Sequence, residues 1–191
     1  MKLPDSEHFT QQWLIHGVTR DFRFEGVWAL PTPGGKDDFP RLVRILTGFD
    51  EARRPGSLVG TLFAIRETVG RMFGWDGKLA GSGRPSLRRR LPEELADDAP
   101  PVTLPMGLVP LYQTDSEWAA ELINKTVHGV VHVGWTQHGP GGYHGQIAML
   151  VKPNGLLGRA YLAAIAPLRY LIIYPRLLSW VGRKWSTCHN Y

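Results

Sequence analysis

The sequence predicts an α+β domain in which a curved antiparallel sheet wraps around a long C-terminal helix. Three features predict it: one strand-like segment followed by two short helical segments, several segments with the two-residue period of strands, and a long apolar segment at the end. Strands that follow one another without intervening helices favour antiparallel pairing. This order therefore argues against a doubly wound parallel sheet.

The length and composition fit one globular domain, which we expect to span residues 1–191. Hydrophobic residues make up 43% of the chain and charged residues 20%, as in proteins with an ordinary core. The single cysteine, Cys188, cannot form an internal disulfide, which favours a reducing compartment. The N-terminal residues have no apolar run of signal-peptide length. We therefore expect a cytoplasmic protein.

The net charge of +5 permits an anionic partner without requiring one. The densest basic cluster, 84–90, is followed at once by the acidic residues of 93–98. Such mixed charge is typical of a solvated loop, whereas nucleic-acid-binding proteins gather Lys and Arg on one face. We expect no nucleic-acid partner.

The first half of the chain contains one expected strand, 21–30, with Phe22, Phe24 and Trp28 on one face. Helical spacing of apolar residues predicts a helix from Phe39 to Leu46 and a second helix over 57–72. Residues 76–105, rich in Gly, Pro and charge, are interpreted as a long surface excursion with a short helix over 92–97.

Strand periodicity returns after residue 105 and predicts strands over 108–113, 126–136 and 143–152. The segment 117–123 suits a helix or a strand. A hairpin with 126–136 would favour the strand. About five strands are expected in all.

The last segment, 155–185, is the most apolar of the chain. Arg159, Arg169 and Arg176 interrupt it, and Pro167 and Pro175 are expected to break it. A membrane-spanning helix needs about 20 apolar residues nearly free of charge, so we expect no transmembrane span. A peripheral amphipathic helix stays open as an alternative.

Several residue types could carry chemistry. His128 and His132 share one face of a strand but lie roughly 13 Å apart, too far to bind one metal ion, so no metal site is expected. They are either hydrogen-bonded imidazoles or acid–base groups lining a cavity. The catalytic candidates are His128, His132, His144, Tyr143 and Glu121.

The acidic residues Asp115, Glu117 and Glu121 could form a carboxylate cluster, but we expect solvated surface acids. The chain also has seven tryptophans. Tryptophan fills cores, and it also lines apolar pockets that hold ligands. The ligand-binding candidates are Trp28, Trp118, His132, Trp135 and Tyr161.

Six segments together resemble one bacterial family, the domain of unknown function 2867. They are 28–35, 38–42, 115–121, 124–129, 132–135 and 151–155. The resemblance covers about 13–185, nearly the whole chain, and several of its blocks are specific. It implies a helix-grip fold of the Bet v 1-like, START-related superfamily, with a cavity between sheet and helix. It implies no established activity, so no catalytic residue follows from it.

The expected function is therefore the binding of an apolar or amphipathic small molecule in such a cavity, without a cofactor. Two alternatives stay open. One is a cyclase- or hydratase-like enzyme that uses cavity His, Tyr and Glu residues as acid and base. The other is a module that interacts with a protein or a membrane surface through the C-terminal segment. The oligomeric state is not predicted.

Overall fold

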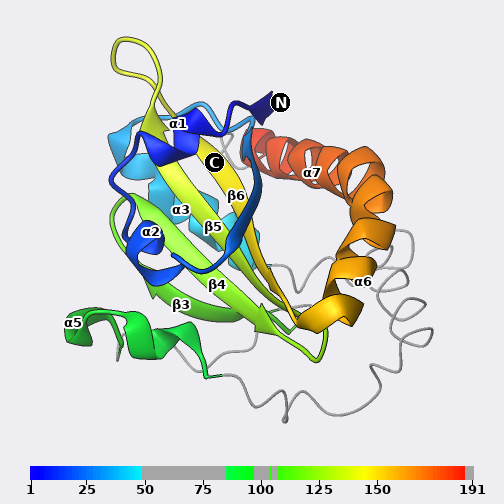
Figure 1. The fold of residues 1–191 in the computed structure, drawn as a ribbon. Coiled ribbons are helices and arrows are strands. Elements are labelled where there is room, and N and C mark those ends of the chain that lie inside the picture. The colour runs from blue at the N-terminus through cyan, green and yellow to red at the C-terminus, as the bar shows by residue number, and fades with distance from the viewer. Residues whose placement is uncertain (49–84, 97–103, 105–106, 188–191) are drawn as a thin grey trace.

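The fold of the chain, seen in a computed structural model, is an α+β arrangement with a curved antiparallel sheet and a long C-terminal helix (Figure 1). The structure describes residues 1–48, 85–96, 104 and 107–187. In this part of the chain the sheet has six strands in the order β1-β2-β6-β5-β4-β3. The strands are β1 (Lys2–Leu3), β2 (Arg23–Ala29), β3 (Val109–Gln113), β4 (Glu117–Ile123), β5 (Val127–Gln137) and β6 (Tyr143–Pro153).

The centre of the sheet is a hairpin of two 11-residue strands, β5 and β6. The ambiguous segment 117–123 is strand β4, paired antiparallel with β5. A tight connection explains this pairing, because the Asn124 side chain accepts hydrogen bonds from the backbone N–H groups of Thr126 and Val127. An Asx turn of this kind favours a hairpin over a continued helix.

A bulge in β2 changes which of its aromatic residues share a face. The register shifts between Phe24 and Gly26, and one extra residue in a strand moves the following side chains to the opposite face. Phe22 and Phe24 pack on one side of the sheet, whereas Trp28 belongs to the core on the other side. The prediction that all three share a face is therefore wrong.

The helix predicted after the first strand is present as α3 (Phe39–Thr47), preceded by the turn η1 (Lys36–Asp38). Its buried residues are those of the predicted apolar stripe. The predicted second helix, 57–72, lies outside the described residues. Two short helices, α1 (Ser6–Phe9) and α2 (Leu14–Val18), precede β2 and were not predicted.

The described part of the predicted surface excursion contains η3 (Leu87–Arg90) and α5 (Glu93–Ala96). Leu87 and Leu91 are buried in the core on the α2 side of the sheet. Arg90 forms an ion pair with Asp21 at 2.5 Å. This part of the excursion is thus packed against the domain by both apolar and charged contacts.

The C-terminal segment forms one continuous helix of 33 residues, Gly155–Thr187. It consists of α6 (Gly155–Leu168), a π-helical turn η5 (Arg169–Ile173) and α7 (Tyr174–Thr187). The expectation that Pro167 and Pro175 break this segment is wrong. A π turn lies between the two prolines, and such turns accommodate local disruption of the helical hydrogen bonds.

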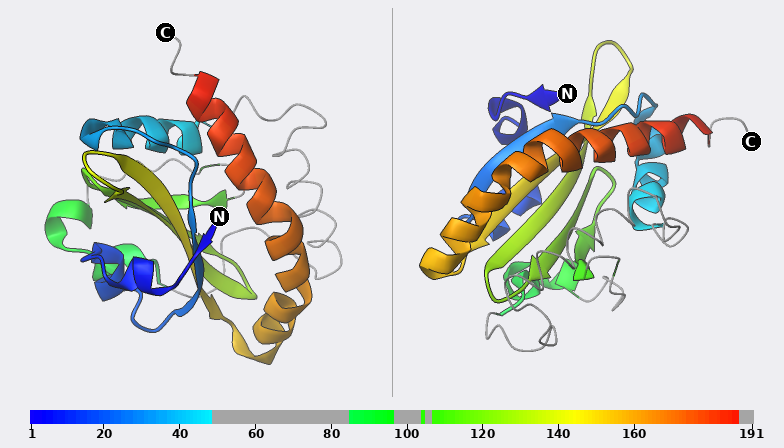
Figure 2. Two further views of the ribbon diagram at one scale, coloured as in Figure 1. Left: turned by 90° about the horizontal axis from the view of Figure 1, so that it is seen from above. Right: turned by 90° about the vertical axis from the view of Figure 1, so that its right-hand side faces the viewer.

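Helices lie on both faces of the sheet (Figure 2). Buried apolar side chains form a core on each face. The larger core joins the sheet to α3 and α7 and contains Trp28, Trp118, Trp135, Trp180 and Trp185. The second joins the other face to α2 and η3. The buried aromatic residues explain why the long helix follows the sheet, since each such side chain removes much apolar surface from water.

Candidate functional site

The face of the sheet that meets the C-terminal helix has a half-buried area at its centre. Four residues define this central patch: Leu122, Gly129, Val131 and Met149. They are neighbours, because Gly129 pairs with Leu122 across β4–β5 and Val131 pairs with Met149 across β5–β6. A Cβ atom added at Gly129 would meet no atom of the described chain within 4 Å. The middle of a central strand is thus left partly uncovered, although strands in such positions are normally packed.

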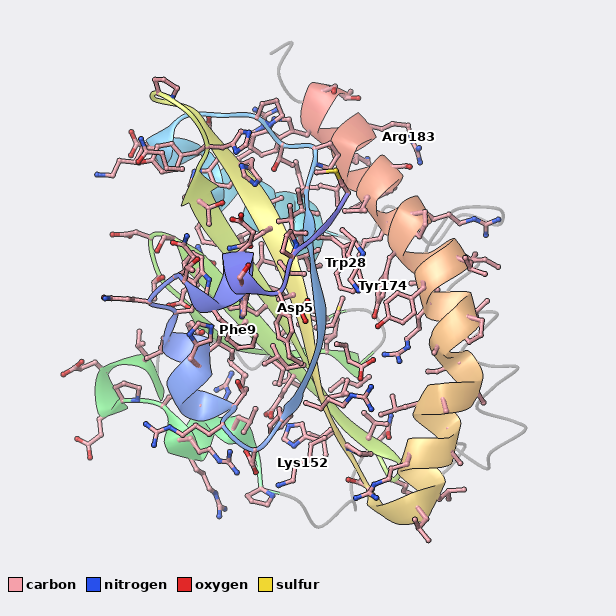
Figure 3. The ribbon with its side chains drawn as sticks, turned by 45° about the horizontal axis from the view of Figure 1, so that its top comes forward. Asp5, Phe9, Trp28, Lys152, Tyr174 and Arg183 are labelled. Carbon is pink, nitrogen blue, oxygen red and sulfur yellow. The ribbon has the colours of Figure 1, made fainter. Side chains whose placement is uncertain are left out.

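Packed side chains close the central patch at both ends of the helix. Near α6, Tyr161 and Leu162 pack against Val127 and Val151. Near α7, Tyr174 meets Trp28 with 4.2 Å between their ring centroids, and these two residues are labelled between sheet and helix in Figure 3. The patch therefore lies between two well-packed clusters.

A half-buried ion pair lies beside the patch, at the bulge of β2. Arg169 from the π turn contacts Glu25 at 2.9 Å, and the side chains are 12% and 6% exposed. The Tyr170 hydroxyl donates to the Glu25 carbonyl oxygen. Gly26, the next residue, pairs with Met149 of the patch. Among its described neighbours Arg169 Nε has no hydrogen-bond partner, so this guanidinium retains a donor beside the apolar patch.

Two buried His–Glu pairs lie on the opposite face of the sheet. Glu117 accepts hydrogen bonds from Leu14 N–H at 2.8 Å, from the Tyr112 hydroxyl at 2.8 Å and from His132 Nε2 at 3.0 Å. This carboxylate is 5% exposed. It ties helix α2 and strand β3 to the centre of the sheet.

The second pair has the same arrangement of one carboxylate acceptor and three donors. Glu121 accepts from Leu87 N–H at 3.0 Å, from the Ser86 hydroxyl and from His128 Nε2 at 2.8 Å. It is 2% exposed, and it ties η3 to the sheet. The expectation that Glu117 and Glu121 are solvated surface acids is wrong: each is a buried acceptor at the centre of three donors.

Hydrogen bonding and burial determine the charge state of the Glu117–His132 pair. Burial by itself would raise the pKa of Glu117, but the bonds from His132, Leu14 and Tyr112 outweigh it and hold the pKa below its usual value. Burial lowers the pKa of His132 despite the opposing effect of Glu117. The pair is therefore a carboxylate that accepts from a neutral imidazole.

Acid–base catalysis by these pairs is not supported by their surroundings. Each carboxylate already accepts from three protein donors, and His132 is 0% exposed. A catalytic acid or base must come within hydrogen-bond reach of a substrate. The contacts instead make the two pairs connections between the sheet and the elements that cover it.

Three imidazole rings gather beside the first pair. The ring centroid of His8 lies 4.9 Å from that of His16 and 5.1 Å from that of His132. Within the described chain, both nitrogens of His8 lack a hydrogen-bond partner. Burial lowers the pKa of His8 to about 3, so its ring is neutral. Among the described residues, no three His, Cys, Asp or Glu side chains are placed so that they could hold one metal ion.

The structure divides the sequence-predicted ligand residues between the two faces. Trp28, Trp118 and Trp135 belong to the core between sheet and helix, and Tyr161 closes the other end of the central patch. His132 lies on the opposite face, with its ring 5.3 Å from that of Trp13. Alternation along β5 explains the separation, because positions 132 and 135 point to different faces.

The catalytic candidates are likewise separated. His128 and Glu121 are paired, and His132 pairs with Glu117 instead. Tyr143 and His144 lie at the far end of the β5–β6 hairpin, where the ring centroid of His144 is 4.9 Å from that of His138. The five candidates therefore do not form one site.

Sequence reasoning missed the residues that define the central patch and its rim. Gly129 follows His128 in the expected strand 126–136, and nothing in the sequence around it indicated a half-buried position. Glu25 follows Phe24 in the expected strand 21–30, so alternation alone would direct it away from the apolar residues. Its contact with Arg169 joins residues 144 positions apart, and a single sequence carries no local signal for such a contact.

One comparison with known proteins gives a match. The model of the family described as "Protein of unknown function (DUF2867)" matches residues 18–176. No curated protein and no solved structure matches the chain. The matched region includes the central patch, the Glu25–Arg169 pair and both His–Glu pairs, and it covers most of the 191 residues. The chain belongs to the DUF2867 family.

Proposed function

We propose that the protein binds an apolar or amphipathic small molecule between the sheet and the C-terminal helix, over the central patch. The observation that carries the proposal is the partial exposure of Leu122, Gly129, Val131 and Met149 in the middle of the sheet. Ligand sites are concave surfaces with a mostly apolar lining and a few placed polar groups. The patch supplies the apolar lining.

The residues around the patch define what such a ligand would look like. An apolar body would lie on Gly129, where the absent side chain leaves room, and would contact Val131 and Met149. The Arg169–Glu25 pair beside the patch offers a charged donor and a carboxylate acceptor. This arrangement favours a molecule with one polar end over a pure hydrocarbon.

The proposal is tested by filling the space above Gly129. The probe is 1-anilinonaphthalene-8-sulfonate, an apolar molecule with one anionic end, whose fluorescence rises in apolar surroundings. We expect the native protein to bind it in saturable fashion and Gly129→Phe to weaken binding at least tenfold, because the new ring would occupy the patch. Fluorescence titration measures the affinity, and thermal unfolding shows whether the variant still folds.

The matched control is Gln137→Phe, which adds the same ring at an exposed end of the same strand. It should bind the probe like the native protein. Equal binding by Gly129→Phe and the native protein would contradict the proposal. So would the absence of saturable binding together with native mass spectra that show no co-purified small molecule.

A further inference from the structure

We propose that the outer face of the C-terminal helix docks on an anionic membrane surface, with the helix parallel to the bilayer. The proposal concerns a different surface from the ligand site. It begins with four large aliphatic side chains that the fold leaves in solvent: Leu156 is 80% exposed, Leu157 62%, Leu171 76% and Ile172 37%. Single exposed apolar residues are ordinary, but a group of them on one element indicates an interaction site.

These side chains belong to one continuous stripe. Exposed residues recur every three or four positions, which places them on the same side of a helix. The docking stripe consists of Leu156, Leu157, Ala160, Ala163, Ala164, Pro167, Leu171 and Ile172. The opposite side of the same helix is buried against the sheet through Gly158, Tyr161, Leu162 and Tyr174. The helix is thus apolar on two sides, and among the described residues only the inner side has a partner.

The charge of the helix identifies the partner. No Asp or Glu occurs between Gly155 and Thr187, whereas Arg159, Arg176 and Arg183 are exposed. An apolar stripe with basic and no acidic neighbours is complementary to a bilayer whose phosphate headgroups carry negative charge. A partner protein with an ordinary mixed-charge surface would find no acidic residue on this helix to pair with its lysines and arginines.

The contacts of the inner face favour docking over spanning. The helix is long and apolar enough to cross a membrane, although core helices of soluble proteins pass the same test. Only 11% of its most apolar stretch is buried in the domain. Packing in the core therefore does not explain why this stretch is so apolar. Yet Arg169 pairs with Glu25, and the Trp185 ring N–H donates to the Pro33 carbonyl. Insertion across the bilayer would break these contacts, while docking keeps them.

The test is co-sedimentation of the full chain with vesicles of phosphatidylcholine alone or mixed with phosphatidylglycerol. We expect binding to the anionic vesicles that weakens with salt.

Leu156→Glu with Leu171→Glu should abolish it, because both residues lie in the stripe and are exposed. Arg159→Gln with Arg176→Gln should weaken it about 25-fold, roughly fivefold for each charge. Ser186→Glu with Thr187→Glu adds the same charge outside the stripe. It should weaken binding about as much as the two arginine substitutions, without abolishing it.

Thermal unfolding of each variant should match that of the native protein, since none of these side chains is buried. The proposal is overturned if no vesicle binds the protein, or if the two stripe glutamates leave binding unchanged. Resistance of the bound protein to extraction with alkaline carbonate would show a spanning helix instead. Self-association without lipid that the stripe glutamates abolish would assign the surface to a second copy of the chain.

Discussion

Glu117 and Glu121 show how a single residue can connect separate parts of the fold. Each carboxylate accepts one hydrogen bond from a histidine of β5 and two from other elements. The two others come from α2 and β3 for Glu117, and from the start of η3 for Glu121. A buried carboxylate is costly unless such donors surround it. Once they are in place, removal of the acceptor leaves several buried donors without partners.

We therefore expect Glu117→Gln to lower the free energy of unfolding by about 2 kcal/mol. The amide keeps the shape of the side chain, but it loses the charge and directs N–H groups toward other donors. Urea denaturation measures the change. Asp115→Asn, the same type of substitution at an exposed position of the preceding turn, should change stability by less than about 0.5 kcal/mol. Equal effects would contradict a structural role for Glu117.

The pKa of His8 predicts how stability depends on pH. It is about 3 in the folded chain, where burial disfavours the charged ring, against an ordinary value of 6.5. The unfolded chain therefore binds the proton first, and the unfolding free energy should fall as the pH drops from 6.5 toward 3. His132 and His16 have lowered pKa values and add to this loss. Below about pH 4.5 the carboxylates with lowered pKa, including Glu117, add a further loss.

The variant His8→Phe should make the pH dependence between 6.5 and 4.5 shallower. Its ring can still pack against Phe24, which His8 contacts in a stacked arrangement at 5.0 Å. Unfolding free energies measured by denaturation across this pH range give the slope. Gln137→Phe is the control, because it adds the same ring at an exposed position and removes no titratable group, and its slope should equal that of the native protein. A native stability that does not change over this range would contradict the assignment.

At the scale of elements, a close contact between backbones determines how α6 meets the sheet. Gly158 lies against the chain before β5, and a Cβ added there would lie 2.2 Å from the Thr126 carbonyl oxygen. No side chain fits at that distance without displacement of the backbone. The bulge in β2 also determines how the long helix meets the sheet, because it directs Glu25 toward Arg169 and Trp28 toward Tyr174.

We expect Gly158→Ala to destabilise the protein by about 2 kcal/mol, because α6 must move away from the hairpin to make room. Alanine otherwise favours helices over glycine, so a loss of stability would identify the close contact as its cause. Gly17→Ala in α2 is the matched control: its Cβ would meet nothing within 4 Å, and a stability equal to or above that of the native protein is expected. Thermal unfolding of the two variants compares them directly.

At the scale of the whole molecule, the long helix covers one face of the sheet and completes the larger core. Tyr174, Trp180, Val181 and Trp185 of α7 are all buried in it. The same helix leaves its outer stripe in solvent. Its position therefore combines a structural role for the inner face with the proposed membrane docking of the outer face.

The structural role predicts that Trp185→Ala lowers the unfolding free energy by about 3–5 kcal/mol, the usual cost of removing a large buried aromatic side chain. Trp185 is 3% exposed and its ring N–H donates to Pro33. Ser186→Ala, at the next and exposed position, should have little effect. Chemical denaturation gives both values, and a small effect of Trp185→Ala would show that α7 does not complete the core.

Patterns within single segments predicted much of this fold. Helix α3 and strands β5 and β6 follow from local periodicity, and the succession of strands correctly indicated an antiparallel sheet. Strand β4 was ambiguous from its own residues, because Glu117 and Glu121, four positions apart, share a face in a helix as well as in a strand. Only the hairpin with β5 decides between them.

The sequence by itself determined the α+β class, the main strands, the long last helix and the histidines on one face of β5, because these depend on periodicities of two and about 3.6 residues. Tertiary structure alone decided the partners and the burial: Glu117 and Glu121 became buried acceptors, Trp28 changed face at a bulge, and Gly129 was left half-buried. The physical reason is that burial and hydrogen bonding depend on groups far apart in the chain, such as Arg169 and Glu25. Local spacing does not encode those distances.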